Sequence, residues 1–227
     1  MSMNCDIVKV TPKERRWTIV FAITLMLATT IPYILGFANA GTDWHFTGFV
    51  FGVEDGNSYI AKMLSGANGD WLFFTPYTAL PQNGVIAFLP YILFGKLSSF
   101  PGQHEQLVVL FHLFRIFAGV LSILATYEFI AIYLAKVKSR RAGVIIVSLG
   151  GGLGWLLVLI GKDQLLGSLP LEFYSPESFG FLALFGLPHL ALARAFLLWG
   201  FRIYLVRDKE SVEVFQKNKP VGDKRKI

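Results

Sequence analysis

The chain has 227 residues, of which 54% are hydrophobic and 16% are charged, and its mean hydropathy is +0.54. Long apolar runs exclude an ordinary soluble domain and predict an integral membrane protein. The formal net charge of +6 does not require a nucleic-acid partner, because the Lys and Arg residues concentrate beside the apolar runs, as they do in cytoplasmic loops. The single cysteine, Cys5, excludes a disulfide within the chain, and its place before the first apolar run is typical of the reducing side of a membrane.

The first predicted span covers residues 17–37, which carry no charge and would form a helix about 31 Å long. Residues 1–16 are short, polar and basic, which predicts a cytoplasmic N-terminus. Ala38-Asn39-Ala40 has the small-residue pattern of a signal-peptidase site, so a cleaved signal peptide is the alternative to a retained helix. The apolar run is longer than the core of a usual signal peptide, which favours a retained span.

A long loop, residues 38–105, follows the first span. It contains more acidic than basic residues, which predicts an extracytoplasmic position. Within it, residues 84–100 are apolar, but Pro90 and Gly95-Lys96 interrupt this short run. We therefore expect an interfacial or re-entrant helix here rather than a full span.

Three further spans are predicted, at residues 106–135, 142–161 and 188–206, with a second exterior loop at 162–187. Residues 207–227 form a basic tail that is expected on the cytoplasmic side. Four spans with both termini inside satisfy the charge rule at every loop. The predicted fold class is an all-α integral membrane protein of the plasma (inner) membrane. It has about four transmembrane helices and a long first extracytoplasmic loop that carries juxtamembrane helices.

One stretch of the first exterior loop gathers acidic, aromatic and glycine residues outside the apolar runs. Glu54 and Asp55 are adjacent there, and Tyr59 follows at helical spacing. This pattern predicts a helix with an acidic first turn, capped by Asn57 or Ser58. Because acidic residues at a helix N-terminus interact favourably with the helix dipole, an ordinary capped helix is one interpretation.

The same order of residues resembles the first extracytoplasmic loop of C-fold (GT-C superfamily) glycosyltransferases, such as protein O-mannosyltransferases and lipid A aminoarabinose transferases. In those enzymes an acidic pair precedes a tyrosine, a small residue and a methionine, and a Gly-Asp-Trp follows. The matching residues here are Glu54, Asp55, Tyr59, Ala61, Met63, Gly69, Asp70 and Trp71. The acid order is reversed and one extra residue precedes Tyr59. Asp55 is our first choice for the family's catalytic Asp, and Glu54 is the second.

The resemblance implies transfer of a sugar from a polyprenyl-phosphate carrier to an acceptor hydroxyl at the outer membrane face. It implies that Asp55 acts as a general base or, in metal-dependent members, as a ligand of a divalent cation such as Mg or Mn. Tyr59 and Asp70 of the same motif are further candidate site residues. The implied partners are the sugar donor and membrane lipids, with no nucleic acid. Because such enzymes have more spans than are predicted here, the match covers an N-terminal portion. We expect either a partner chain that supplies the missing helices or a truncated product that is inactive alone.

Ionisable residues near the predicted spans are candidates for binding, because a charge inside a membrane is costly and tends to be functional or paired. His112 and Arg115 lie three residues apart near the outer end of the second span, where they are candidates for binding the donor phosphate. The alternative is a structural ion pair between Arg115 and a loop acid. His189, with Glu177 before it, forms a second candidate set that completes the site opposite Asp55; the alternative is a packing histidine.

The glycine-rich run at residues 148–154 lies in a predicted span and not after a strand, so it predicts close helix packing rather than nucleotide binding. Glu128, deeper in the second span, is expected to pair with another group. The alternative class for the whole chain is a non-enzymatic multi-pass membrane protein, such as a transporter half or an assembly factor. A transporter would place ionisable groups near the bilayer midplane. The acids here gather in exterior loops, which favours the glycosyltransferase hypothesis.

Overall fold

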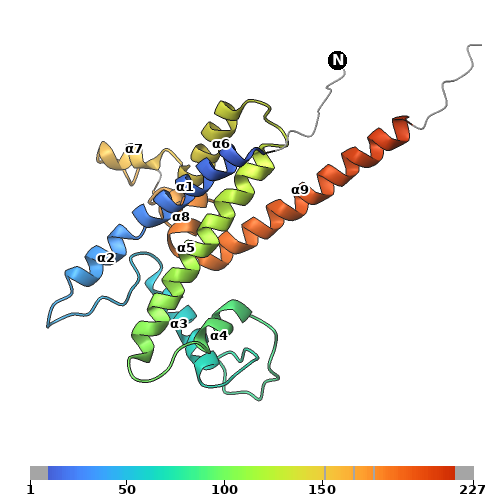
Figure 1. Cartoon of the computed structure of the whole chain (residues 1–227). Helices are drawn as coiled ribbons and strands as arrows, with labels where there is room; N and C mark the ends of the chain where they lie inside the picture. The colour runs from blue at the N-terminus through green and yellow to red at the C-terminus, as the bar shows by residue number, and fades with distance from the viewer. Residues whose placement is uncertain (1–9, 151, 166, 176, 218–227) are drawn as a thin grey trace, which may run out of the picture.

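A computed structural model of the chain describes residues 10–217 apart from 151, 166 and 176 (Figure 1). The side chains are described as far as residue 207. Cys5 and the end of the expected basic tail therefore lie outside the described residues. Where the chain is described it is helical, with no strand, and its one isolated β-bridge joins Phe73 to Val85.

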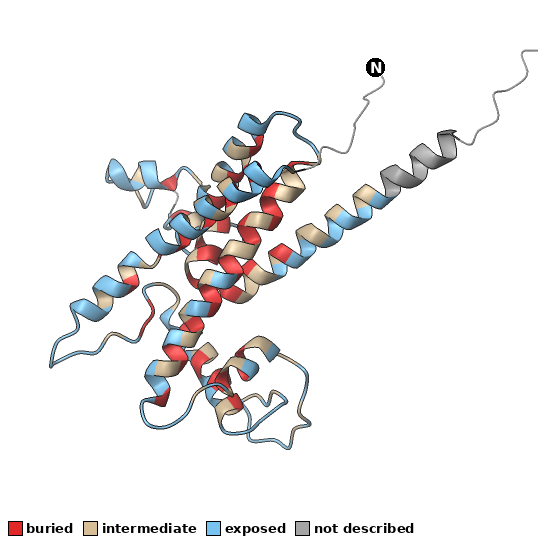
Figure 2. Ribbon diagram, in the orientation of Figure 1, coloured by how far each residue is buried: buried red, intermediate tan, exposed pale blue. Residues whose placement is uncertain are grey.

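Three long helical segments are long and apolar enough to cross a membrane, at Pro12–Ala38, Gln103–Ile130 and Pro188–Arg207. They correspond to the first, second and last predicted spans. The middle segment is α5 (Gln103–Ile130), which packs against α1 (Pro12–Ala28) and α9 (Pro188–Lys217) (Figure 1). In the apolar 18-residue stretch of this segment, half of the residues are buried inside the molecule, compared with 22% and 11% in the corresponding stretches of the first and last segments. Figure 2 shows this buried core running along α5, so α5 is the central helix.

The first segment is divided into α1 and α2 (Ile31–Ala38) by a pair of threonines. The hydroxyls of Thr29 and Thr30 each donate to the carbonyl oxygen of Met26 at 2.8 Å. Pro32 has no N–H to continue the helical hydrogen bonds. The helix is interrupted at this point, because the backbone N–H of Thr30 donates to Leu27 and the two threonine hydroxyls take the Met26 carbonyl oxygen.

The predicted span at 142–161 is not one helix. It is divided between α6 (Val137–Leu149) and α7 (Gly154–Leu159), and neither reaches the length needed to cross a bilayer. The backbone N–H of Gly154 donates to the carboxylate of Glu172, so a loop acid provides the partner that a continuous helix would have provided internally. Gly152 and Gly154 pack against that loop at Glu172 and Pro170, so at these two glycines the expected close helix–helix packing is not found.

The long segment between the first two apolar helices carries two short helices, α3 (Val53–Ala67) and α4 (Leu89–Gly95), and α4 is the helix expected within residues 84–100. They cross at two glycines. A Cβ atom on Gly66 would overlap the backbone of α4, and one on Gly95 would overlap the backbone of α3. Only glycine permits this approach, which joins the two helices into one unit below α5 (Figure 1).

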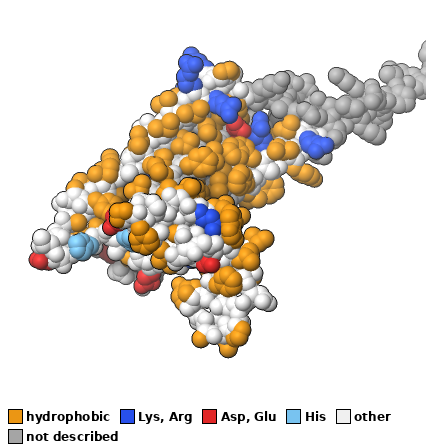
Figure 3. Space-filling model, turned by 60° about the horizontal axis from the view of Figure 1, so that its bottom comes forward, with side chains coloured by type: hydrophobic (Ala, Val, Ile, Leu, Met, Phe, Trp, Pro, Cys, Tyr) orange, Lys and Arg blue, Asp and Glu red, His pale blue; other side chains and the backbone are white. Residues whose placement is uncertain are grey.

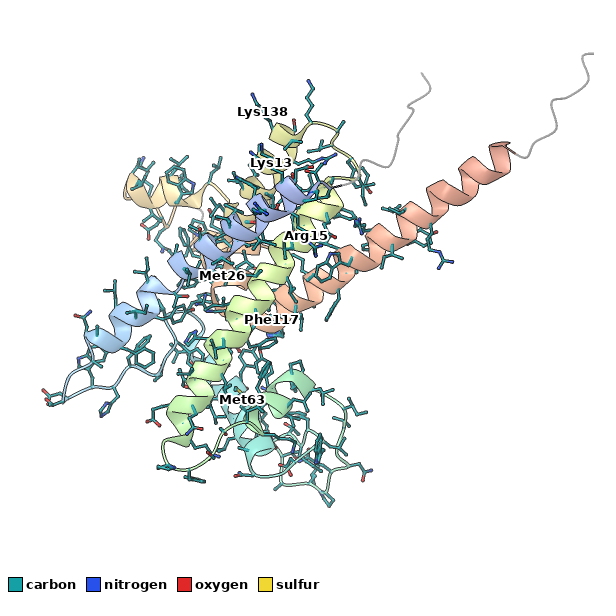
Figure 4. All side chains as sticks on the ribbon, viewed as in Figure 1. Lys13, Arg15, Met26, Met63, Phe117 and Lys138 are labelled. Carbon is teal, nitrogen blue, oxygen red and sulfur yellow. The ribbon has the colours of Figure 1, made fainter. Side chains whose placement is uncertain are left out.

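Charge and apolar surface are separated along the bundle. Lys13, Arg15 and Lys138 lie at one end of the molecule, and Met63 of α3 lies at the other (Figure 4). The surface between them is largely hydrophobic, and most of the visible basic side chains lie towards one end, although single acidic and basic side chains also lie close together (Figure 3). The exposed apolar side chains on the sides of the long helices include Ile23, Leu27, Val109, Leu113, Phe196 and Phe201. Exposed apolar area of this extent indicates a surface that contacts lipid or protein.

A buried ion pair that the sequence analysis did not identify lies at the basic end. Arg140 donates to the Glu14 carboxylate at 2.8 Å, and both residues are almost fully buried. The Tyr127 hydroxyl donates to the same oxygen at 2.8 Å, so α1, α5 and α6 are joined at one point. Glu128 lies nearby on α5 and accepts a hydrogen bond from Trp199, which confirms that it is paired.

Candidate functional site

The acidic pair lies in the first turn of α3, as expected, and both carboxylates are exposed. Within the described residues, neither Glu54 nor Asp55 has a hydrogen bond or an ion pair. The expected capping by Asn57 or Ser58 is wrong, because α3 begins before these residues. The N-cap is Gly52 in the left-handed conformation, and no side chain caps the helix.

Three elements that are far apart in the sequence meet directly beside this acidic turn. Tyr59 of α3 stacks on Tyr91 of α4, with ring centroids 4.7 Å apart and planes within 9° of parallel. The Tyr91 hydroxyl lies 2.8 Å from Nδ1 of His189, at the start of α9. The rings of His189 and Tyr59 are 5.0 Å apart. His189 is therefore hydrogen-bonded and does not merely pack among apolar side chains.

The electrostatics of this cluster link the other predicted residues to it. Burial, together with the charges of Asp55 and Glu177, raises the pKa of the Tyr59 phenol to about 12. The charges of the same two acids also act on His189. The structure thus brings Tyr59 and His189, from two separate predicted sets, into contact with Tyr91, which sequence reasoning missed, and the charges of Asp55 and Glu177 act on this cluster.

A cavity of about 320 Å³ lies between another face of α3 and residues 73–77, and none of the residues of the His189 cluster lines it. The Lys62 ammonium lies 5.0 Å from the Tyr59 ring and donates to the Ser58 hydroxyl at 2.6 Å. Burial lowers the Lys62 pKa, against the opposing effects of Tyr77 and Asp55. The cavity is lined by Ser58, Ala61, Lys62, Ser65, Asp70, Phe73, Phe74, Thr75, Pro76 and Tyr77. It therefore offers one cation and several hydroxyl groups beside an aromatic wall.

Asp70 lies on this cavity and not in the cluster around His189. Its carboxylate accepts a hydrogen bond from the Ser65 hydroxyl at 2.5 Å, which fixes it near the end of α3. The following Trp71 packs under the Lys96 ammonium at 4.2 Å. The Gly-Asp-Trp motif therefore organises the junction between α3 and α4, and its acid faces the cavity.

Arg115 and His112 lie elsewhere, buried at the interruption of the first segment. Arg115 has no exposed surface and donates to the hydroxyls of Thr29 and Thr30 at 2.9 and 2.7 Å. It also donates from Nε to Nδ1 of His112 at 3.3 Å, which leaves Nε2 of that ring to donate to the Gly48 carbonyl oxygen at 2.9 Å. No carboxylate within the described residues forms an ion pair with Arg115, so the alternative of a structural ion pair is not found.

The residues around Asp55 do not fit a metal ion. No group of three or more His, Cys, Asp or Glu residues lies close enough together to hold one, among the residues that the structure describes. A hard divalent cation requires several oxygen ligands converging on one point. We therefore derive no chemical step through a metal.

An all-helical chain with three apolar helices of spanning length has the architecture of a helical membrane protein. Its polar cluster lies at the end of the bundle opposite the basic residues (Figure 4). No protein-family model, curated protein or solved structure matches the chain. The function must therefore be argued from this site.

Proposed function

We propose that the chain forms the outer-face site of a membrane glycosyltransferase, which transfers a sugar from a polyprenyl-phosphate carrier to an acceptor hydroxyl. The observation that supports this most directly is the convergence of Asp55, Tyr59, Tyr91 and His189 from three elements at one end of the bundle. A cavity with a few convergent polar groups beside it is the usual arrangement of a small-molecule site. The resemblance of the α3 stretch to GT-C enzymes points in the same direction.

The proposed orientation follows the charge rule, with the basic end of the bundle in the cytoplasm of the cell and both termini inside. This places α3, α4 and the start of α9 at the outer face of the plasma membrane. Because α5 and α9 both run away from that face, the chain between them has to cross the membrane. We propose that α6, α7 and α8 (Gly180–Gly186) make this crossing as short helices, together with helices of a partner chain.

In the proposed reaction, the oxygen of the acceptor hydroxyl forms a bond to the anomeric carbon of the sugar. The bond from that carbon to the phosphate oxygen breaks, and the carrier leaves with the electron pair as polyprenyl phosphate. Asp55 accepts the proton of the acceptor hydroxyl, a role that its exposure and lack of a protein partner permit. Lys62 and His189 stabilise the charge on the leaving phosphate.

The buried environment of Arg115 changes the role proposed for it. A phosphate would have to displace Thr29, Thr30 or His112 to reach its guanidinium. We propose that Arg115 is a positioning residue. Through His112 it fixes the backbone at Gly48, in the chain that leads directly into α3.

Binding of a short-chain polyprenyl-phosphate sugar to the full chain in lipid nanodiscs tests the proposal. Lys62→Met should weaken binding about tenfold or more, because a hydrogen bond to a charged group contributes about 1.5–3 kcal/mol. Asp55→Asn should bind within about twofold of the wild type, since the proposed base acts on the acceptor and not on the donor. Asp43→Asn is the matched control, because Asp43 is an exposed acid of the same loop away from the cluster.

Absence of binding by the wild type would refute the proposal that this chain by itself holds the donor site. A gain in binding by Asp43→Asn as large as the loss caused by Lys62→Met would also refute it, because both changes would then reflect only the net charge of the loop. Where binding is found, transfer to an acceptor is assayed with the same variants. Asp55→Asn should then lose transfer while it retains the donor.

A further inference from the structure

A second cavity, of about 680 Å³, lies away from the proposed catalytic cluster, between the end of α2 and the first turns of α5. It combines an apolar wall with several titratable side chains. Its lining residues are Phe37, Ala40, His45, Phe46, Thr47, His104, Glu105, Val108 and Val109. The volume lies within the range of about 300–1,000 Å³ that is usual for small-molecule sites.

The walls of this cavity are held in place by specific contacts. Phe46 packs edge-on against Phe37 of α2, with ring centroids 4.9 Å apart. Gly48 has a φ of 92° and lies so close to Val108 that a Cβ atom would overlap that side chain. The His112 ring binds the Gly48 carbonyl oxygen at 2.9 Å. The segment that carries residues 45–47 is therefore anchored to both neighbouring helices.

Three titratable side chains around the cavity have no protein partner. His45, His104 and Glu105 are exposed, and none of them forms a hydrogen bond or an ion pair within the described residues. They also do not converge on a point where one metal ion would be held. This spacing suits a ligand that carries its charged and polar groups at separate positions.

The position of the cavity indicates that the ligand is amphiphilic. Phe37 and Val109 line it and are also about half exposed, on helices that are apolar enough to cross a membrane. His104 and Glu105 lie in the first turn of α5, and His45 lies in the segment that follows α2. The ends of membrane-spanning helices are where the bilayer meets water. A ligand in this cavity would therefore meet apolar side chains on one side and polar groups on the other, as a membrane lipid does.

We propose that this cavity binds a phospholipid whose head group carries a primary ammonium, as in phosphatidylethanolamine. Glu105 pairs with the ammonium, the imidazole N–H groups of His45 and His104 donate to phosphate oxygens, and the apolar wall contacts the first methylenes. A carboxylate beside two hydrogen-bond donors complements a zwitterion better than it complements an anionic head group. This site is separate from the glycosyltransferase proposal and does not depend on it.

Native mass spectrometry of the detergent-solubilised full chain tests the site, with equimolar phosphatidylethanolamine, phosphatidylcholine and phosphatidylglycerol of identical acyl chains. The wild type should retain phosphatidylethanolamine about fivefold over each of the other two, the factor that a partly exposed ion pair supplies. Glu105→Gln should abolish this preference. Asp163→Asn, which removes an acid from the second exterior loop, should leave it unchanged.

Val109→Trp provides an independent variant, because it fills the cavity without changing a charge and its site is exposed enough to accept the larger side chain. It should lower retention of phosphatidylethanolamine to the level of the other lipids. Equal retention of the three lipids by the wild type would overturn the proposal. A preference that survives both Glu105→Gln and Val109→Trp would overturn it as well.

Discussion

Arg140→Met tests whether the buried ion pair holds the basic end of the bundle together. The substitution removes the guanidinium and leaves the Glu14 carboxylate buried, with Tyr127 and Thr11 as its remaining donors. Removing one partner of a buried pair costs about 3–5 kcal/mol, because the other charge is left uncompensated. Nη2 of Arg140 has no hydrogen-bond partner in the described structure, which reduces what the native pair contributes. We therefore expect a loss near the lower limit, about 3 kcal/mol.

The double variant Glu14→Leu with Arg140→Met should be much less destabilised than Arg140→Met, because removing both charges leaves no unpaired group. The expected coupling energy between the two sites is about 2–3 kcal/mol. The assay is unfolding by sodium dodecyl sulfate in mixed micelles, followed by near-UV circular dichroism. Arg15→Met is the matched control, since Arg15 is exposed at the same end, and it should change stability by less than about 0.5 kcal/mol.

Two results would refute this reasoning. If Arg140→Met costs no more than Arg15→Met, the pair does not stabilise the contact of α1 with α6. If the two single substitutions add without coupling, Glu14 and Arg140 contribute separately and the ion pair carries no net energy.

Further predictions concern the crossing of α3 with α4, Gly200 of α9 and the Tyr59 phenol. Gly66→Ala should destabilise the fold by about 1–3 kcal/mol in the same micelle assay, because the new Cβ overlaps the α4 backbone. Gly200→Ala should instead stabilise α9 by up to about 1 kcal/mol, since its Cβ meets open space; equal effects of the two would contradict the tight α3–α4 crossing. Ultraviolet titration should show phenols that ionise near pH 12, and Tyr59→Phe should remove one of them. Folding raises the pKa of this phenol from 10.0, so the neutral Tyr59 contributes its full stability below pH 10 and loses it as the pH rises through about 12. If the phenol that Tyr59→Phe removes instead ionises near pH 10, the burial of Tyr59 is contradicted.

The long helices could be predicted from the sequence because hydropathy depends only on local composition. The first, second and last apolar runs correspond to helices of spanning length, and the acidic turn lies at the start of α3. The run at 142–161 is also apolar, but whether it forms one continuous helix depends on a residue outside the run. Glu172 binds the backbone at Gly154 from a distant loop, and hydropathy contains no information on that contact.

The site was predictable in part for the same reason. His189 and Asp55 were recognised as polar residues in unusual positions, but the hydrogen bond of His189 to Tyr91 joins residues 98 positions apart. No local sequence pattern predicts this hydrogen bond, because a tyrosine at position 91 is also compatible with an ordinary apolar helix. The partners of Arg115 were missed because acids were considered as its partners, whereas the structure supplies threonine hydroxyls from an interrupted helix.

The burial of Arg115 among uncharged groups has an electrostatic consequence for the whole outer half of the molecule. A guanidinium is always protonated, and within the described residues no carboxylate pairs with this one. In a layer of low dielectric constant, its charge is weakly screened and acts over a long distance. We therefore expect a positive potential around the buried Arg115, which favours anionic groups at this part of the bundle over small cations.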